Sequence, residues 1–166
     1  KIILTCGCFD ILHVGHIKLL HEAKKLGDVL IVCLSSDEQI KYLKGNNRPI
    51  NNLNDRLKLF INLVDVDYVF PYEENINNNE ENINNEEQLD KIMNLVEPEF
   101  WVKGNDYNEV DIRKIHPKLG KIKLIPLINN KSTTNIINKI NNISKVNQYC
   151  IDYVDQSESI LDIKKN

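Results

Sequence analysis

The chain has 166 residues, a net charge of −3 at pH 7 and an apolar fraction of 42%, which suits one domain with a full core. The slight negative charge excludes the broad basic field typical of nucleic-acid binders, and no apolar stretch predicts a membrane span or a signal peptide. Four cysteines without zinc-ligand spacing predict a reduced, cytoplasmic protein. The chain begins at Lys1 on the first predicted strand, as a trimmed chain or one domain of a longer polypeptide would.

The first predicted unit is a strand, a corner and a helix. Apolar residues 2–6 predict a short buried strand, and residues 17–26 have helical periodicity that ends at Gly27. The corner between them reads Gly-Cys-Phe-Asp-Ile-Leu-His-Val-Gly-His, from Gly7 to His16. Free backbone N–H groups and the positive end of a helix dipole favour a phosphate at such a corner.

Two histidines lie in this corner, at the start of the helix. His13 and His16 are three residues apart, so both side chains project from one helix face. Two imidazoles over a nest of backbone amides suit a triphosphate and a pentacoordinate phosphorus. The alternatives are a core histidine beside a helix-capping one, or a pair of metal ligands.

Strands and helices alternate along the rest of the chain. We expect strands over 29–36, 68–70, 100–103 and 122–127, and helices over 38–43 after a cap at Asp37, 55–64 after a cap at Asn54, 88–96, 110–115, and from a cap at Ser132 to about 140. This alternation predicts an α/β fold, a single domain over residues 1–140 with a Rossmann-like, doubly wound parallel sheet of about five strands. Ligands then bind at the carboxyl ends of the strands.

Two segments stand outside this pattern. Residues 73–87 are almost only Asn, Glu and Ile, which predicts a loose, low-complexity surface insertion, with a partner site as the alternative. Residues 141–166 form a C-terminal tail or an extra helix.

Three basic residues form a cluster after the second strand. Lys44 and Arg48 flank a Gly-Asn-Asn loop, and Arg56 lies near the start of the next predicted helix. Cations of this kind can neutralise a leaving pyrophosphate and an acceptor phosphate. The alternative is ordinary solvated surface charge.

Two further segments follow later strands or open a helix. Lys103, Gly104 and Asp106 come at the end of the fourth strand, where a glycine allows close approach to a base or ribose and a carboxylate can bind ribose hydroxyls or a magnesium-bound water. An ordinary turn has the same composition. Ser132, Thr133 and Thr134 open the last helix and offer a second anion site, with a plain N-cap as the alternative.

The His-x-Gly-His corner resembles the signature of the cytidylyltransferase-like nucleotidyltransferases, and the resemblance covers about residues 2–140. The motifs Gly-Cys-Phe-Asp-Ile-Leu-His, Leu-Lys-Gly-x-x-Arg-Pro, Val-Lys-Gly-x-Asp-Tyr and Ser-Thr-Thr-Asn-Ile-Ile look closer to the adenylyltransferase domain of the ADP-heptose synthases. The cytidylyltransferases for phosphorylated alcohols typically carry an Arg-Thr-Glu-Gly-like run before Ser-Thr-Thr, where this chain has Ile128-Asn129-Asn130-Lys131. The last two of these residues and the insertion also depart from the adenylyltransferase pattern.

The resemblance implies an enzyme that joins an NMP from an NTP to a phosphorylated small acceptor and releases pyrophosphate. ATP with a sugar 1-phosphate is expected; the alternatives are CTP with phosphoethanolamine, phosphocholine or glycerol 3-phosphate, and an idle nucleotide-binding module. Mg²⁺ would be held through the phosphates, with Asp10 as a candidate ligand, and the enzyme would be a homodimer. The implied catalytic residues are His13, His16, Lys44 and Arg56; the nucleotide-binding residues are Gly7, Cys8, Phe9, Asp10, Gly15, Lys103, Gly104, Asp106, Ser132, Thr133 and Thr134; and Lys44, Arg48 and Arg56 would bind the acceptor phosphate.

Overall fold

The computed structural model describes residues 1–72, 87–105, 107–110, 113 and 120–143. The chain divides into two compact units, residues 1–129 and 130–166. The division falls before the Ser-Thr-Thr segment. The domain boundary expected at residue 140 stays a prediction. The predicted insertion lies almost entirely outside the described residues, as do most of the short helix expected over 110–115 and most of the tail.

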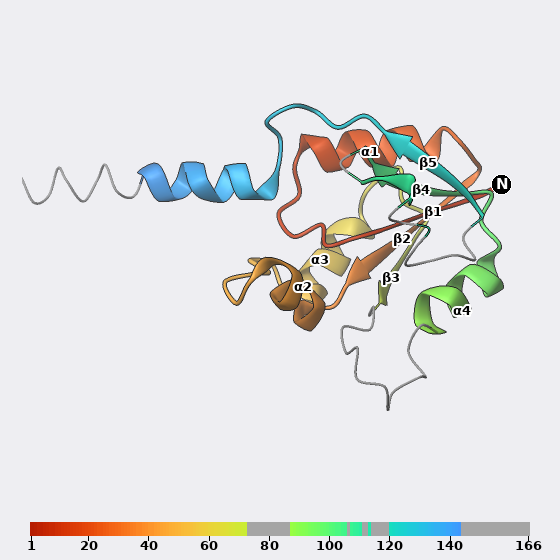
Figure 1. Cartoon of the computed structure of the whole chain (residues 1–166), viewed down its shortest axis with the longest axis horizontal. Helices are drawn as coiled ribbons and strands as arrows, with labels where there is room; N and C mark the ends of the chain where they lie inside the picture. The colour runs from red at the N-terminus through yellow and green to blue at the C-terminus, as the bar shows by residue number, and fades with distance from the viewer. Residues whose placement is uncertain (73–86, 106, 111–112, 114–119, 144–166) are drawn as a thin grey trace, which may run out of the picture. The chain divides into compact units, whose positions relative to one another are not determined.

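The first unit contains a five-stranded parallel sheet in the order β3-β2-β1-β4-β5 (Figure 1). This confirms the Rossmann-like, doubly wound fold. The strands are β1 (Ile2–Gly7), β2 (Val29–Ser35), β3 (Tyr68–Tyr72), β4 (Phe100–Gly104) and β5 (Lys121–Ile125), and the labelled helices are α1 (Val14–Lys24), α2 (Asp37–Lys44), α3 (Leu53–Phe60) and α4 (Glu87–Val96).

The strand order reverses between β1 and β4, and these two strands separate at their carboxyl ends. β1 pairs with β2 as far as Gly7, but its pairing with β4 ends where Thr5 faces Val102. β4 continues beside β5 as far as Gly104. In open α/β sheets, ligands bind in the crevice that such a reversal creates.

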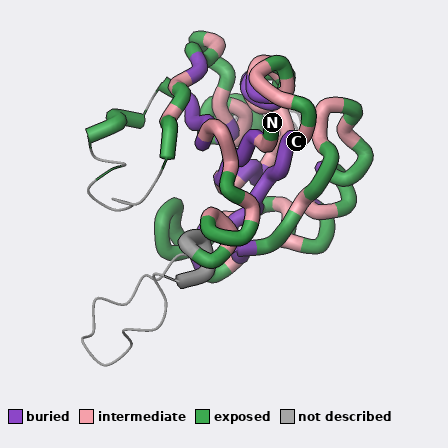
Figure 2. The backbone as a smooth tube through the Cα atoms, turned by 90° about the vertical axis from the view of Figure 1, so that its right-hand side faces the viewer, coloured by how far each residue is buried: buried purple, intermediate pink, exposed green. Residues whose placement is uncertain are grey.

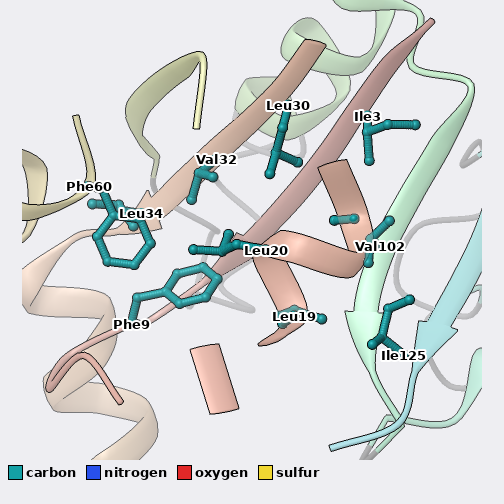
Figure 3. Packing of buried hydrophobic residues seen from close by; sticks show 11 residues of the cluster. Ile3, Phe9, Leu19, Leu20, Leu30, Val32, Leu34, Phe60, Val102 and Ile125 are labelled. Atoms are coloured by element: carbon teal, nitrogen blue, oxygen red, sulfur yellow. The ribbon is translucent and has the colours of Figure 1, made fainter. Parts of the chain in front are cut away.

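Successive side chains of each strand point to opposite faces, so the sheet has a hydrophobic cluster on each side. One cluster joins Ile3, Leu30 and Val32 of the strands to Leu20 of α1 and Phe60 of α3 (Figure 3). The other joins Leu4, Cys6, Ile31, Cys33 and Trp101, with partly buried residues of α4 packed against them. The buried backbone segments accordingly lie inside a shell of exposed ones (Figure 2). Helices therefore cover both faces and leave the carboxyl edge of the strands for the loops.

Two helix starts differ from the predicted ones. Ser36, not Asp37, caps α2, because its extended backbone lets the hydroxyl accept a hydrogen bond from the Gln39 amide. Asn52, not Asn54, caps α3 in the same way, and α3 ends at Phe60 rather than near residue 64. Asn and Ser side chains cap a helix where their own backbone is extended. The spacing of residues in the sequence does not reveal these backbone dihedral angles. In the described part of the chain, no helix combines the length and apolar character needed to cross a membrane.

Candidate functional site

The corner after β1 has a strained backbone at Phe9. This residue has φ of 44°, a left-handed conformation that is uncommon for a bulky side chain. The Phe9 ring is buried, with its centroid 5.0 Å from that of Phe60. A Cβ at Gly7 would lie 2.9 Å from Cε2 of Phe9, so this ring position requires a glycine there. Strain held by packing of this kind is typical of functional sites.

The two histidines stack on each other where α1 begins. Their ring centroids are 3.7 Å apart with an interplanar angle of 21°. The Phe9 ring meets the His16 ring edge-on, with 5.1 Å between the two ring centroids. His13 is the N-cap, and its Nδ1 accepts a hydrogen bond of 3.1 Å from the Gly15 backbone N–H. The capping alternative is therefore correct for His13. Because Nδ1 accepts, the neutral ring carries its hydrogen on Nε2 and can donate it to a ligand.

Both imidazoles are neutral at neutral pH. Burial lowers the pKa of His16 to about 3, the neighbouring His13 lowers it as well, and the Asp10 carboxylate opposes the shift. Burial also lowers the pKa of His13. The buried Nδ1 of His16 has no hydrogen-bond partner among the described residues. Buried polar atoms are almost always hydrogen-bonded, so an unpaired nitrogen here indicates a site for a polar ligand.

Asp10 serves the loop that follows α2, which corrects its predicted role as a magnesium ligand. Its carboxylate accepts hydrogen bonds from the backbone N–H groups of Ile50 and Asn51, and it forms an ion pair with Arg48. Its side chain is inaccessible to solvent. Both oxygens therefore already have partners within the protein, and Asp10 connects the corner to the loop before α3.

Arg56 is the clearest departure from the predicted site. The sequence placed it as a free cation for phosphates, but its side chain is 0% exposed. Nε donates to the Asn51 carbonyl, one terminal nitrogen donates to the carbonyls of Cys8 and Ser35, and the other binds the Asp37 carboxylate. The guanidinium thus holds the protein's own carbonyls in place and does not face a ligand.

The other two predicted cations have different settings. Lys44 is the last residue of α2 and is exposed, as a phosphate-binding cation must be. Arg48 is only 12% exposed and is paired with Asp10. Of the three predicted cations, Lys44 alone keeps its charge available at the surface.

Lys103 and Gly104 end β4, at the same edge of the sheet as the histidine corner after β1. The Lys103 side chain is buried, and its Nζ donates a 2.7 Å hydrogen bond to the Cys6 carbonyl, just where β1 and β4 stop pairing. The same Nζ lies 4.8 Å from the ring centroids of Trp101 and Tyr107. The strand register therefore brings the ends of β1 and β4 to one edge, while Asp106 lies outside the described residues.

Ser132, Thr133 and Thr134 belong to the second unit and are described only within it. Ser132 caps a helix over residues 133–143, because its hydroxyl accepts a hydrogen bond from the Asn135 amide. The expected cap is therefore correct.

The described residues contain no group of three or more His, Cys, Asp or Glu side chains that could hold a metal ion.

Two residues of this network were missed at the sequence level. Asp37 was taken for a helix cap and Asn51 was not considered, yet both bind Arg56, and the Asn51 side chain also donates to the Asp10 carbonyl. Asp37 and Asn51 lie five to 41 residues from their partners along the chain, so no local sequence pattern predicts these hydrogen bonds.

Comparison with known proteins identifies the family. Residues 4–149 match the cytidylyltransferase-like family. The chain belongs to that family. The nucleotidyltransferase class expected from the His-x-Gly-His corner is thereby confirmed at the family level.

Curated relatives of this cytidylyltransferase-like chain carry the name bifunctional protein HldE. The protein from Aliarcobacter butzleri is 42% identical over 89% of this chain, and that from Haemophilus influenzae is 40% identical over 84%. The chain spans only 28% of the length of either relative. These relatives confirm the resemblance to the adenylyltransferase domain of the ADP-heptose synthases.

Solved structures agree with the fold. A lipopolysaccharide core biosynthesis protein from Thermoplasma volcanium has a TM-score of 0.57 and 30% identity, covering 76% of this chain and 95% of its own. A pantoate-beta-alanine ligase from Francisella tularensis has a TM-score of 0.51 over 76% of this chain and 59% of its own, but only 20% identity, and shows the fold alone.

Proposed function

We propose that this chain transfers a nucleoside monophosphate from a nucleoside triphosphate to the phosphate of a small acceptor, with release of pyrophosphate. The observation that carries the proposal is the stacked pair of neutral histidines at the start of α1, beside the strained corner at Phe9. This pair lies after β1, at the reversal of strand order where α/β sheets bind ligands.

The reaction needs no covalent enzyme intermediate, because the acceptor phosphate is already an anionic nucleophile. One of its oxygens attacks the α-phosphorus in line, the bond from that phosphorus to the bridging oxygen breaks, and pyrophosphate leaves with the bonding electrons. Catalysis is then positioning and stabilisation of charge on the phosphoryl oxygens.

The histidines would act as neutral hydrogen-bond donors. The Nε2–H of His13 is available, since its Nδ1 is already occupied by Gly15. His16 would meet the oxygens of the α-phosphate. A neutral donor, already fixed in place, stabilises charge that develops in the transition state without reorganisation.

The backbone of the corner would cradle the phosphates. Cys8 and Phe9 would supply backbone N–H groups, and Gly7 and Gly15 would allow the phosphates to approach closely. Lys44 would neutralise the acceptor phosphate and the leaving pyrophosphate. Lys103, Gly104 and Asp106 would meet the nucleoside, and the hydroxyls of Ser132, Thr133 and Thr134 would bind the triphosphate. Arg48 and Asp10 would act by shaping the loop between α2 and α3, on the strength of their mutual ion pair. Mg²⁺ would arrive with the triphosphate.

ATP and a sugar 1-phosphate are the proposed substrates. The absence of an Arg-Thr-Glu-Gly run before Ser-Thr-Thr and the similarity to the HldE proteins support them. CTP with a phosphorylated alcohol is the second candidate, supported by the sequence Gly104-Asn105-Asp106, which also suits a cytosine site. A homodimer and a cytoplasmic location remain predictions from the sequence.

Pyrophosphate release tests the proposal. The protein is incubated with Mg²⁺, each NTP in turn, and a panel containing sugar 1-phosphates, phosphocholine, phosphoethanolamine and glycerol 3-phosphate. We expect release with ATP and a sugar 1-phosphate only. Release with CTP and an alcohol phosphate would select the second candidate, and nucleotide binding without release from any pair would identify an idle nucleotide-binding module.

A further inference from the structure

Arg56 joins three segments at the carboxyl edge of the sheet. Its guanidinium holds the carbonyl of Cys8 in the corner at 2.9 Å, that of Ser35 at the end of β2 at 2.8 Å, and that of Asn51 before α3 at 3.0 Å. Asp37, in the first turn of α2, binds the remaining terminal nitrogen at 2.6 Å. Four hydrogen bonds from one fully buried side chain make it a brace between separate loops.

The bond to Cys8 has a direct consequence for the proposed phosphate site. The carbonyl of Cys8 and the N–H of Phe9 belong to one planar peptide group and point in opposite directions. When Arg56 holds the carbonyl inward, the Phe9 N–H must point away from the guanidinium. The orientation of this donor is therefore set by a residue that cannot itself reach a ligand.

We propose that Arg56, together with Asp37, is a positioning residue that orients the Cys8–Phe9 peptide for phosphate binding. This inference rests on the proposed function, because it takes that peptide to face the triphosphate. Asp10 ties the same corner to the backbone of Ile50 and Asn51, so the corner and the loop before α3 form one unit. Misplacement of this unit misplaces the groups that contact the reacting phosphate.

A substitution at Asp37 distinguishes two roles for Arg56, positioning the peptide or binding phosphate directly. The two roles predict opposite effects of removing the Asp37 charge. If Arg56 binds phosphate, removal of the competing carboxylate frees the guanidinium and tightens nucleotide binding. If Arg56 is a brace, removal of that charge weakens the brace and lowers turnover.

The experiment compares Arg56→Lys and Asp37→Asn with the control Lys58→Met, which removes a positive charge from an exposed position of the same helix. The readouts are kcat, KM and the dissociation constant for ATP with Mg²⁺, thermal unfolding, and the amide ¹⁵N chemical shift of Phe9. We expect Arg56→Lys to lower kcat on the order of 10²-fold, as misplacement of reacting groups does. Lysine should not rescue function, since an ammonium cannot reproduce the planar fork.

We expect Asp37→Asn to lower kcat roughly threefold or more, because a charge-assisted hydrogen bond becomes a neutral one of about half the strength. Its ATP affinity should not rise, and Lys58→Met should match the wild type. Tighter ATP binding by Asp37→Asn, or near-normal kcat in Arg56→Lys, would overturn the proposal.

Failure of the proposed function gives a different result. In that case the wild type releases no pyrophosphate, whether or not it binds ATP. The amide signal of Phe9 still tests whether Arg56 orients the Cys8–Phe9 peptide. We expect the amide ¹⁵N chemical shift of Phe9 to change in Arg56→Lys and to stay the same in Lys58→Met. A shift that does not change in Arg56→Lys overturns the inference. If Arg56→Lys does not fold, Asp37→Asn decides by the same signal, because it keeps an acceptor and removes only a charge.

Discussion

His16 combines several unusual properties in one side chain. It stacks on His13, contacts the ring of Phe9, and has a buried nitrogen without a partner among the described residues. Burial of an ionisable group without compensation is costly, and such groups concentrate at functional sites. His16 is therefore where we expect substitution to separate activity from folding.

His16→Ala should lower kcat about 10²–10³-fold, which is the usual cost of removing one donor to a developing oxyanion. The control is His21→Ala, on the same helix but exposed and paired with Asp65 outside the corner. Steady-state pyrophosphate release measures the effect, and thermal unfolding checks that the fold remains. Near-normal turnover by His16→Ala would show that the phosphate site has been misassigned.

The lowered pKa of His16 predicts a dependence of stability on pH. The unfolded chain gains a proton near the ordinary pKa of 6.5, whereas the folded chain gains it only near 3, so acidification between these values favours unfolding. Between pH 7.5 and 5 this group alone should lower the free energy of unfolding by about 2 kcal/mol, at about 1.4 kcal/mol for each unit of pKa difference.

Urea unfolding of the wild type and His16→Asn at both pH values measures this difference. The variant lacks the titrating group and should lose about 2 kcal/mol less on acidification. Equal losses in the two proteins would show that His16 titrates normally in the folded state.

At the scale of elements, α3 is a short helix that places the Arg56 guanidinium among the loops at the carboxyl edge of the sheet. Its start depends on Asn52, whose side-chain oxygen accepts from the Asp55 amide at 3.0 Å and whose side-chain nitrogen donates to the Asp55 carboxylate at 2.9 Å. Short helices are marginal without such caps and tertiary contacts. The cap therefore contributes to the placement of the buried guanidinium as well as to helix stability.

Asn52→Ala should lower the free energy of unfolding by about 1 kcal/mol, the usual cost of losing an Asn cap. Asn54→Ala is the matched control, because Asn54 is exposed inside the helix, where alanine is favoured. Chemical denaturation of both variants distinguishes the two positions. A larger loss from Asn54→Ala would mean that the helix begins two residues later than described.

At the scale of the whole molecule, the parallel sheet places the carboxyl ends of β1 and β4 next to each other although the two strands are far apart in sequence. Phosphates are proposed to lie on the β1 side, and the nucleoside on the β4 side. A site that reads a base edge through buried hydrogen bonds discriminates strongly, because the wrong base leaves polar groups unpaired.

Calorimetric titration of the wild type with ATP and with CTP, each with Mg²⁺, measures this discrimination. We expect ATP to bind more tightly, since the chain lacks the Arg-Thr-Glu-Gly run of the cytidylyltransferases for phosphorylated alcohols. CTP binding tenfold or more tighter would exclude the adenylyl assignment and leave the His-x-Gly-His chemistry unaffected.

The sequence by itself determined the order of the elements and the place of the histidine corner. Apolar runs such as that of β2 and helical periodicity such as that of α1 depend on residues close together in the chain, so their patterns predict them directly. The five parallel strands and the position of His13 and His16 at the start of a helix followed from these local patterns.

Only the tertiary structure decided which charges face a ligand and which hold the protein together. Arg56 and Cys8 are 48 residues apart, and Asp10 and Ile50 are 40 apart, so no local pattern distinguishes them from exposed Lys44. The neutrality of His16 likewise comes from burial against Phe9 and His13. Burial and partner choice depend on contacts between distant segments, and these form only when the sheet brings the segments together.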